Sequence, residues 1–216
     1  MNKFTKLLLI SLSALIFTGC ATQGPKDYTN FRASDPKSIL ILPPKNSSPD
    51  VSASYSVYSH TQKPLAESGF YVLPITLVDE TFKNNGMTVA DDIHALDKAK
   101  LHEIFGADAG LYIEVKSYGT KYYVVGSASI VTAEAKLFDL RNGNLLWDGS
   151  ATASSEEGQN NQGGLAAMLV AALVKQIIGT ATDQSHQIAK VTNARLLTAG
   201  APNGILYGPR HPQYKK

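Results

Sequence analysis

Residues 131–147, VTAEAKLFDLRNGNLLW, carry the strongest structural signal in the chain. Up to Leu137, small or aliphatic side chains alternate with polar ones, which is the two-residue period of a strand with one buried face. Asn142-Gly143 then tolerates the positive φ angles that a tight turn requires. These residues predict an antiparallel β-hairpin.

The pairing within this hairpin has two solutions. A two-residue loop at Asn142-Gly143 places Phe138 opposite Trp147, whereas a bulge at Gly143 shifts the pairing and can exchange the two faces. A second alternating run precedes the hairpin, and in it Leu111, Ile113 and Val115 alternate with Tyr112, Glu114 and Lys116. This run predicts a further strand.

The part of the chain before this sheet is predicted to begin strand, helix, strand, helix. Residues 38–42 form a short apolar run closed by Pro43-Pro44, which is typical of a strand buried on both faces, and residues 70–73 form the second strand. Helices are expected from Asp50 to Gly69, over Thr76–Lys83, and over Lys98–Phe105 between an Asp97 cap and Gly106. The residues expected at helical spacing on their apolar faces are Val51, Tyr55, Tyr58, Leu65, Leu101, Ile104 and Phe105.

The sequence therefore predicts the α/β class. We expect one domain over residues 38–200, with two or three layers, a mixed sheet, a carboxy-terminal antiparallel hairpin and flanking helices. With a single cysteine the domain has no internal disulfide, so its stability must come from a packed core.

Apolar residues after the hairpin predict more helix. A helical stripe is formed by Leu165, Met168, Leu169, Ala172, Leu173 and Ile177, and it resumes beyond Gly179 with Ile188, Val191 and Leu197. One long kinked helix or two helices fit this pattern. The run from Leu165 to Val174 suits a core helix better than a helix pressed on a partner or a bilayer.

The last residues, 201–216, are rich in proline and glycine. That composition predicts an extended tail. It can lie on the domain or be offered as a peptide to a partner.

The amino terminus has the features of a secretory signal. Lys3 and Lys6 precede an apolar run from Leu7 to Phe17, which is too short for the roughly 20 apolar residues of a membrane-spanning helix. Small residues and then Cys20 follow. We expect residues 1–19 to be removed.

The residues before the cleavage point resemble the lipobox of bacterial lipoproteins. Its four positions are filled by Phe17, Thr18, Gly19 and Cys20, of which Phe17 is atypical. The resemblance implies a diacylglycerol thioether on the Cys20 sulfur and an acyl chain on its amino group. Ala21, in place of the aspartate of inner-membrane lipoproteins, favours the outer membrane. Residues 20–37, polar and broken by Pro25 and Pro36, then predict a flexible tether.

The net charge of the chain limits which classes of partner are expected. The formal net charge is +2, but loss of Lys3 and Lys6 leaves 18 Lys+Arg against 18 Asp+Glu. A nearly neutral chain does not favour nucleic acid, whose binding depends largely on phosphate neutralisation.

Four features together resemble one family of bacterial lipoproteins without an established function. They are the strand ending in Pro43-Pro44, Gly106-Ala107-Asp108 before a strand, the hairpin from Asp139 to Trp147, and the tail Tyr207-Gly208-Pro209. The resemblance implies a fold similar to the amino-terminal domain of TolB and to the periplasmic part of the secretion lipoprotein CsgG. It also implies a CsgG-like lipoprotein as a partner.

No catalytic or metal-binding motif emerges from the sequence. His60, His94, His102, His186 and His211 are dispersed, without the i, i+4 spacing of a helical zinc site. The adjacent acids Asp91-Asp92 and Glu156-Glu157 point in different directions on a helix or strand. The chain also lacks the Gly-x-Ser-x-Gly elbow and the P-loop lysine. We expect no cofactor, no metal and no enzymatic activity.

Tyrosines are the best candidates for a binding surface. Tyr118, Tyr122 and Tyr123 lie near a probable strand turn, where an interface and ordinary edge packing are equally consistent. Tyr207 and Arg210 in the tail are further candidates.

The sequence supports one leading hypothesis and one rival. The first is a periplasmic lipoprotein of the outer membrane that scaffolds or assists an envelope assembly or a CsgG-like secretion complex, alone or as a homo-oligomer. The rival is a protein that binds a small ligand or an envelope glycan and can hydrolyse it. Surface exposure on the outer leaflet also stays open.

Overall fold

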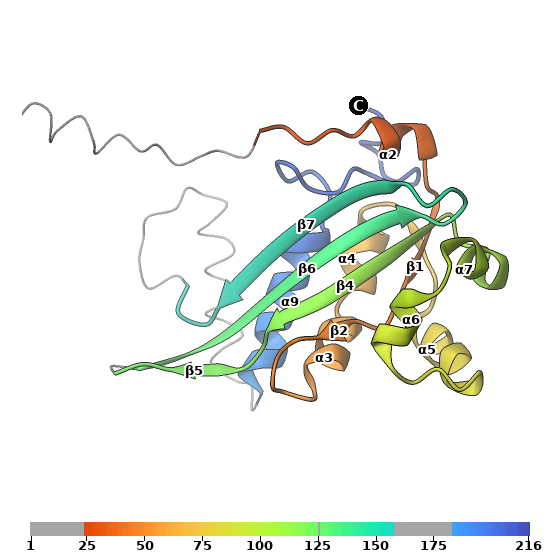
Figure 1. Ribbon diagram of the computed structural model, residues 1–216. Coiled ribbons are helices and arrows are strands. Elements are labelled where there is room, and N and C mark those ends of the chain that lie inside the picture. The colour runs from red at the N-terminus through yellow and green to blue at the C-terminus, as the bar shows by residue number, and fades with distance from the viewer. Residues whose placement is uncertain (1–23, 125, 158–182) are drawn as a thin grey trace, which may run out of the picture.

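The computed structural model describes residues 24–124, 126–157 and 183–216. These residues contain a seven-stranded mixed sheet (Figure 1). The strands are β1 (Ser38–Ile41), β2 (Lys45–Asn46), β3 (Tyr71–Val72), β4 (Ala109–Ser117), β5 (Thr120–Tyr122), β6 (Ser127–Asp139) and β7 (Leu145–Ser154). β1 is parallel to β3 and β4, whereas β6 is antiparallel to β4 and β7. β2 pairs with the second half of β4, and β5 with the start of β6.

Among the described residues, helices cover both faces of the sheet only at its parallel end. The helices are α2 (Thr29–Ser34), α3 (Ala53–Ser59), α4 (Gln62–Glu67), α5 (Ile75–Asn84), α6 (Ala90–Ala95), α7 (Lys98–Phe105) and α9 (Gln184–Leu197). One core joins α3, α4 and α9 to one face of the sheet, and a second joins α5, α6 and α7 to the other face of β1. The domain thus has three layers at β1 and two at β4, β6 and β7, which confirms the predicted α/β class.

The first predicted strand is buried on both faces as expected. Ile39, Leu40, Ile41 and Leu42 have no exposed surface, and they alternate between the two cores. Asp97 caps α7 by accepting a hydrogen bond from the Ala99 amide.

The hairpin has the shifted register. Leu137 lies opposite Trp147 and Phe138 opposite Leu145, so Leu146 is the extra residue of a bulge in β7. The pairing of Phe138 with Trp147 is therefore wrong, and the bulge lies at Leu146 rather than at Gly143. Leu146 and Trp147 are both buried, because the bulge turns two consecutive side chains away from solvent.

The long helix expected after Asp50 is divided into α3 and α4. Pro64 falls in the first turn of α4, where its missing N–H costs nothing, whereas in one continuous helix it would break a hydrogen bond. The division changes which side chains are buried: Tyr58 and Leu65 are in the core, but Val51 is 90% exposed and Tyr55 more than half exposed. The expected burial of Ile104 is also wrong.

The amino-terminal segment packs on the domain, contrary to the flexible tether expected up to residue 37. The Lys26 ammonium lies 2.7 Å from an Asp148 carboxylate oxygen, and the Lys26 amide donates to Asn203 at 3.0 Å. Tyr28 donates its hydroxyl hydrogen to the Gly204 carbonyl, and the Phe31 ring is buried in the main core. The segment is polar and contains prolines, so its sequence resembles a linker. The residues that bind Lys26 and Tyr28 lie more than 100 positions away in the chain, so the local sequence does not show that the segment is ordered.

The carboxy-terminal tail also lies on the domain. The Gly208 amide donates to the Ser68 carbonyl at 2.8 Å, and the Ile205 side chain is buried. The backbones of Gly208 and Gly69 are so close that a Cβ atom on Gly208 would be 2.6 Å from the Gly69 carbonyl carbon. Of the two placements left open for the tail, the structure has the one on the domain.

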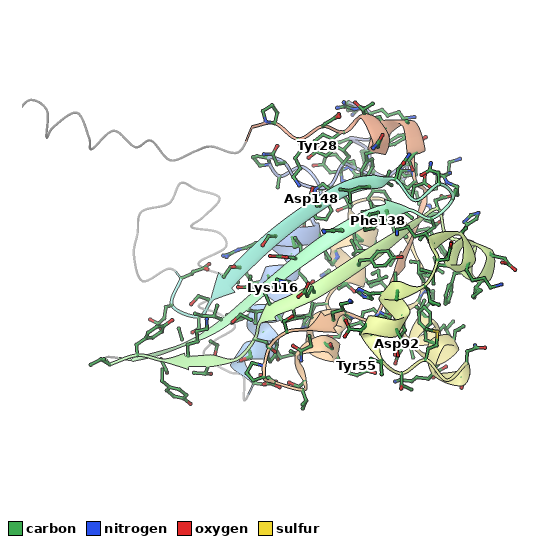
Figure 2. The ribbon with its side chains drawn as sticks, viewed as in Figure 1. Tyr28, Tyr55, Asp92, Lys116, Phe138 and Asp148 are labelled. Carbon is green, nitrogen blue, oxygen red and sulfur yellow. The ribbon has the colours of Figure 1, made fainter. Side chains whose placement is uncertain are left out.

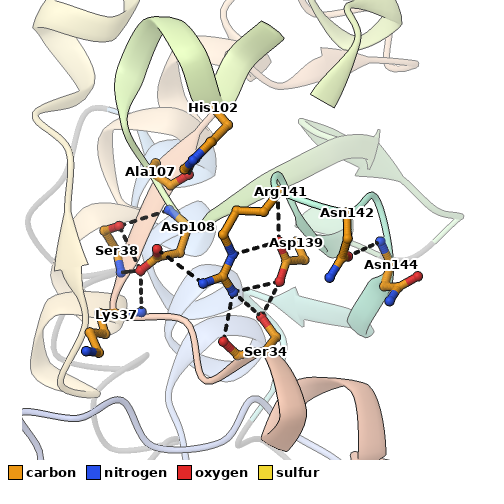
Figure 3. Close-up of polar contacts among 10 residues, drawn as sticks. All are labelled: Ser34, Lys37, Ser38, His102, Ala107, Asp108, Asp139, Arg141, Asn142 and Asn144. Carbon is orange, nitrogen blue, oxygen red and sulfur yellow. Dashed lines mark hydrogen bonds and ion pairs between the residues drawn. The ribbon is translucent and has the colours of Figure 1, made fainter. Parts of the chain in front are cut away.

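One polar cluster joins the amino-terminal segment to the sheet (Figure 3). The Arg141 guanidinium donates to both carboxylate oxygens of Asp139, at 3.0 and 2.7 Å, and to the Ser34 carbonyl at 2.8 Å. Ser34 donates its own hydroxyl hydrogen to Asp139 at 2.6 Å. Beyond Arg141, Asp108 accepts from the Ser38 amide at 3.1 Å. The cluster therefore fixes the end of α2, the start of β1 and the β6–β7 turn together.

Some predicted features lie outside the described residues. They are the signal segment with its lipobox, and the helical stripe from Leu165 to Ile177. Within the described ranges, no helix is both long enough and apolar enough to cross a membrane. The expected later helix is confirmed as α9, where Ile188, Val191 and Leu197 are buried.

Asp139→Asn tests the polar cluster. Burial opposes ionisation of Asp139, but hydrogen bonds from Arg141 and Ser34 outweigh it and lower the pKa to about 2. A group whose pKa falls on folding stabilises the fold above its unfolded pKa, so this contribution is lost as the pH falls from about 4 towards 2. We expect the variant to lose about 2 kcal/mol of unfolding free energy at pH 7, with a smaller difference at pH 3.5.

Urea unfolding at both pH values measures this loss, with Asp91→Asn as the control. Asp91 also forms an ion pair, at 2.7 Å from Lys45, but its side chain is 73% exposed, so loss of its charge should change the unfolding free energy little. Equal losses in the two variants would contradict the stabilising role of the buried carboxylate.

Candidate functional site

The face of β4, β6 and β7 that no described helix covers is the best candidate for a functional surface. Figure 2 shows Lys116, Phe138 and Asp148 on this face, which we call the open face. Its side chains are Tyr112, Glu114, Lys116, Thr132, Glu134, Lys136, Phe138, Asp148, Ser150 and Thr152. They are the alternate residues whose neighbours along each strand fill the main core.

The open face forms the floor of a broad hollow of about 710 Å³. Lys26 and Asn203 stand on one side of it, and Lys45, His94 and Lys98 on the other. The docked amino-terminal segment and the tail therefore build one wall of the hollow.

Like charges stand opposite each other at the centre of this floor. Glu114 of β4 pairs directly with Glu134 of β6, an arrangement that costs stability in an antiparallel sheet. The Lys116 ammonium lies 2.8 Å from Glu114 and 3.8 Å from Glu134, and Ser47 donates to Glu114 at 2.7 Å. Hydrogen bonds from Lys116 and Ser47 lower the pKa of Glu114, and Glu114 shares Lys116 with the opposing Glu134.

Aromatic side chains form the other end of the floor. The rings of Tyr112 and Phe138 meet edge to face at 5.3 Å, and the Lys98 ammonium lies 4.6 Å from the Phe138 ring centre. The Tyr112 hydroxyl is buried without a hydrogen-bond partner among the described residues, and burial raises its pKa to about 12. This end of the hollow thus offers an aromatic surface, whereas the Tyr112 hydroxyl itself is buried.

A second polar cluster lies on the helical side of the sheet. Tyr118 donates its hydroxyl hydrogen to Ser56 Oγ at 2.9 Å, and Ser56 lies 2.9 Å from His186 Nδ1. His186 Nε2 is 3.1 Å from His60 Nε2. Because Ser56 accepts from Tyr118, it is free to donate to His186, which then carries its proton on Nε2 and donates to His60.

This cluster contains a Ser–His pair but lacks the other features of a nucleophile site. Ser56 is 8% exposed and its oxygen is occupied by the Tyr118 hydroxyl, so a substrate carbonyl has no approach through the described residues. Burial, together with the charges that His186 and Lys190 can carry, lowers the pKa of His60 to about 4. The cluster is a structural network in which His60 is neutral at pH 7.

The predicted binding residues have different environments. Tyr118 is buried in the second polar cluster, which corresponds to the packing alternative that the sequence left open. Tyr122 and Tyr123 are exposed at the end of β5. Tyr207 stacks on the His211 ring at 4.1 Å, and the Arg210 guanidinium lies 5.3 Å from the Tyr71 ring centre.

Sequence reasoning missed two groupings. His60 and His186, 126 residues apart, meet because α3 and α9 pack side by side. The open face was signalled by the alternating Glu114-Lys116 and Glu134-Lys136 pairs, which identify an outward strand face but not an uncovered one. Among the described residues, no group of three or more His, Cys, Asp or Glu side chains could hold a metal ion.

Comparison with known proteins supplies the family. The model of the GNA1162-like lipoproteins matches residues 26–210, which include the docked amino-terminal segment and most of the tail. The chain belongs to this family. Its membership confirms the resemblance to a bacterial lipoprotein family that the sequence motifs indicated.

Two relatives of the GNA1162-like family show how far the similarity extends. The chain is 48% identical over 209 residues to lipoprotein NMB1124/NMB1162 of Neisseria meningitidis serogroup B (strain ATCC BAA-335 / MC58), covering 95% of this chain and 96% of that protein. It is also similar to the crystal structure of lipoprotein GNA1162 from Neisseria meningitidis. That match has 51% identity and a TM-score of 0.55, and it covers 67% of this chain and all of the other. The expected likeness to TolB and CsgG stays a prediction.

His60→Gln tests the histidine contact. A histidine whose pKa is lowered by folding favours the neutral form, so its contribution to stability is present above about pH 6.5 and is lost as the pH falls towards 4. We expect the melting temperature of the wild-type protein to fall more steeply than that of the variant as the pH is lowered over this range. Melting curves at pH 7.5, 6.0 and 5.0 measure it, and parallel pH dependences would contradict the burial of a neutral His60.

Proposed function

We propose that this protein is a non-catalytic lipoprotein of the outer membrane that scaffolds or assists an envelope assembly from the periplasmic side. The open face is the surface that binds the assembly, and Cys20 is the attachment to the membrane. Membership of a lipoprotein family and the lipobox-like residues Phe17 to Cys20 support the anchor.

One observation carries the binding role: Glu114 and Glu134 oppose each other on a sheet face that no described helix covers. A pair of carboxylates that shares one lysine is only partly neutralised, and a second cation would complete the arrangement. A partner that presents a basic side chain beside an aromatic or aliphatic one would match both the carboxylate pair and the Tyr112–Phe138 end.

The family resemblance in the motifs makes a CsgG-like lipoprotein the first partner to examine. A second copy of this chain is the other possibility that the open face allows. Neither partner is needed to complete the fold, because both cores close within the described residues.

The hollow also supports the rival function of ligand or glycan binding. Its volume of about 710 Å³ lies in the range of small-molecule sites, roughly 300 to 1,000 Å³. It is a broad depression, however, and the charged groups on its floor are engaged with each other rather than converging on a point. A shallow surface of this kind is better suited to a macromolecular partner.

Cys20→Ala tests the anchor. The variant lacks the sulfur that would carry the diacylglycerol, so it should be neither lipidated nor processed as a lipoprotein. Metabolic labelling with radioactive fatty acid measures the modification. We expect label on the wild-type protein and none on the variant, and equal label on both would refute lipidation at Cys20.

Glu134→Lys tests the open face, with Glu103→Lys as a matched control. Both glutamates are exposed and lie near a lysine, Lys116 or Lys100, but Glu103 is on α7, outside the hollow. A like charge opposite a basic partner should reduce co-purification roughly tenfold or more. Affinity capture from detergent-solubilised envelopes should recover a partner with the wild type and with Glu103→Lys, but not with Glu134→Lys.

Recovery of the wild-type protein alone, under conditions that preserve other envelope complexes, would contradict the scaffold role. Equal capture by all three proteins would instead exclude the open face as the binding surface. Retention of a soluble glycan by the wild type but not by Glu134→Lys would favour the rival function.

A further inference from the structure

The β5–β6 ribbon projects beyond the rest of the sheet (Figure 1). The β7 ladder with β6 begins at Ile130, and Ser129 still bonds Ser155 and Gln184, but Ser127 and Ala128 pair with β5 alone among the described strands. The chain bends between β4 and β5 at Gly119, whose φ of 116° is accessible to glycine but not to other residues without strain. The free end of the ribbon therefore has no neighbouring strand or helix among the described residues.

The end of this ribbon is apolar. Tyr122 is 84% exposed, Val124 is fully exposed and Tyr123 is more than half exposed, and Lys121 precedes them. Exposed aromatic and aliphatic groups at one projecting point are unfavourable in water. We call Lys121 to Val124 the ribbon tip.

The docked amino-terminal segment limits how far the domain can move from its anchor. Lys26 is held by Asp148 and Asn203, so only five residues, 21–25, separate it from Cys20. The six Cα-to-Cα steps from Cys20 to Lys26 span roughly 20 Å at most when the chain is fully extended. Residues 24–28 run along the domain towards the left of Figure 1, and the ribbon projects towards the same side.

We infer that the ribbon tip enters the interface of the lipid bilayer that holds the Cys20 anchor. The inference rests on the proposed anchor and deepens it: the domain has a second, peptide contact with the membrane. The short chain before Lys26 keeps the domain close to the surface, and the ribbon is the part that projects towards it.

The chemistry of the tip matches a bilayer interface. Tyrosine is enriched at the level of the lipid headgroups, where its ring is apolar and its hydroxyl stays hydrated. Val124 can enter the acyl region, and the Lys121 ammonium can remain at the anionic headgroups. A lipid chain and a peptide contact together hold a protein more firmly than either does alone.

The size of the tip argues against a protein partner. An aromatic side chain buries roughly 150 to 250 Å², so two tyrosines and one valine fall short of the roughly 800 Å² that each partner contributes to a specific protein interface. A bilayer imposes no such minimum area.

A fluorescent label at the tip tests the inference. The mature chain has one cysteine, Cys20, which the anchor consumes, so Val124→Cys introduces the only free thiol. Val124 is fully exposed, and its replacement leaves both cores intact. Leu77→Cys is the matched control, because Leu77 is an exposed aliphatic residue of α5, away from the ribbon.

Both variants of the full lipidated protein are labelled with an environment-sensitive dye and reconstituted in vesicles of phosphatidylethanolamine and phosphatidylglycerol. We expect the emission of the dye at position 124 to shift to shorter wavelength and to be quenched by lipids brominated on their acyl chains. The dye at position 77 should show neither change.

Three other results would overturn the inference in distinguishable ways. Equal spectra at both positions in protein that floats with the vesicles would place the tip in water and leave the anchor standing. A shift without vesicles that grows with protein concentration would show contact with a second copy. Incorporation of a second dye at Cys20, with loss of flotation, would refute the anchor and the tip contact that depends on it.

Discussion

The ion pair between Arg141 and the buried carboxylate of Asp139 connects parts of the chain that the sheet alone does not hold. Arg141 belongs to the β6–β7 turn, yet it donates to the Ser34 carbonyl at the end of α2 and lies 3.6 Å from Asp108 before β4. A buried carboxylate must be paired and hydrogen-bonded to remain charged. That requirement makes the position of α2 part of the fold.

The docked segment has consequences for both proposed surfaces. Lys26 and Asn203 form one wall of the hollow above the open face, so the same contacts that shorten the free chain also shape the binding surface. A short free chain restricts the orientations available to the domain at the membrane. With the proposed Cys20 anchor, the ribbon tip and the open face would be presented at defined positions relative to the lipid surface, as the proposed scaffold role requires.

Local sequence patterns predicted much of the fold. Alternation along residues 131–137, the apolar run before Pro43, and the Asp97 cap with Gly106 each act through a few neighbouring residues, and the structure has the expected elements there. The helix break before Pro64 was missed, although the proline itself was a signal. The open face could be predicted as polar, but its lack of a covering helix depends on where the helices pack.

Features that depend on distant partners could not be predicted. The segment before β1 resembles a linker in composition, and its order depends on Asp139, Asp148 and Asn203. His60 and His186 meet only in the folded chain. Tyr118 can be buried since Ser56, 62 residues away in the sequence, accepts its hydroxyl hydrogen. The hairpin register was open for a similar reason: packing of both Leu146 and Trp147 selects the bulge.

Hydrogen–deuterium exchange of the mature lipidated protein tests the docked segment most directly. The amides of Arg32 and Asp35 donate to the carbonyls of Tyr28 and Phe31 in α2. If Lys26 and the Asp139 cluster hold this segment, these amides should be protected far beyond an unstructured peptide, together with those of the neighbouring β1. Exchange at the rate of a free peptide would contradict the docked segment, the short free chain and the fixed position of the domain at the membrane.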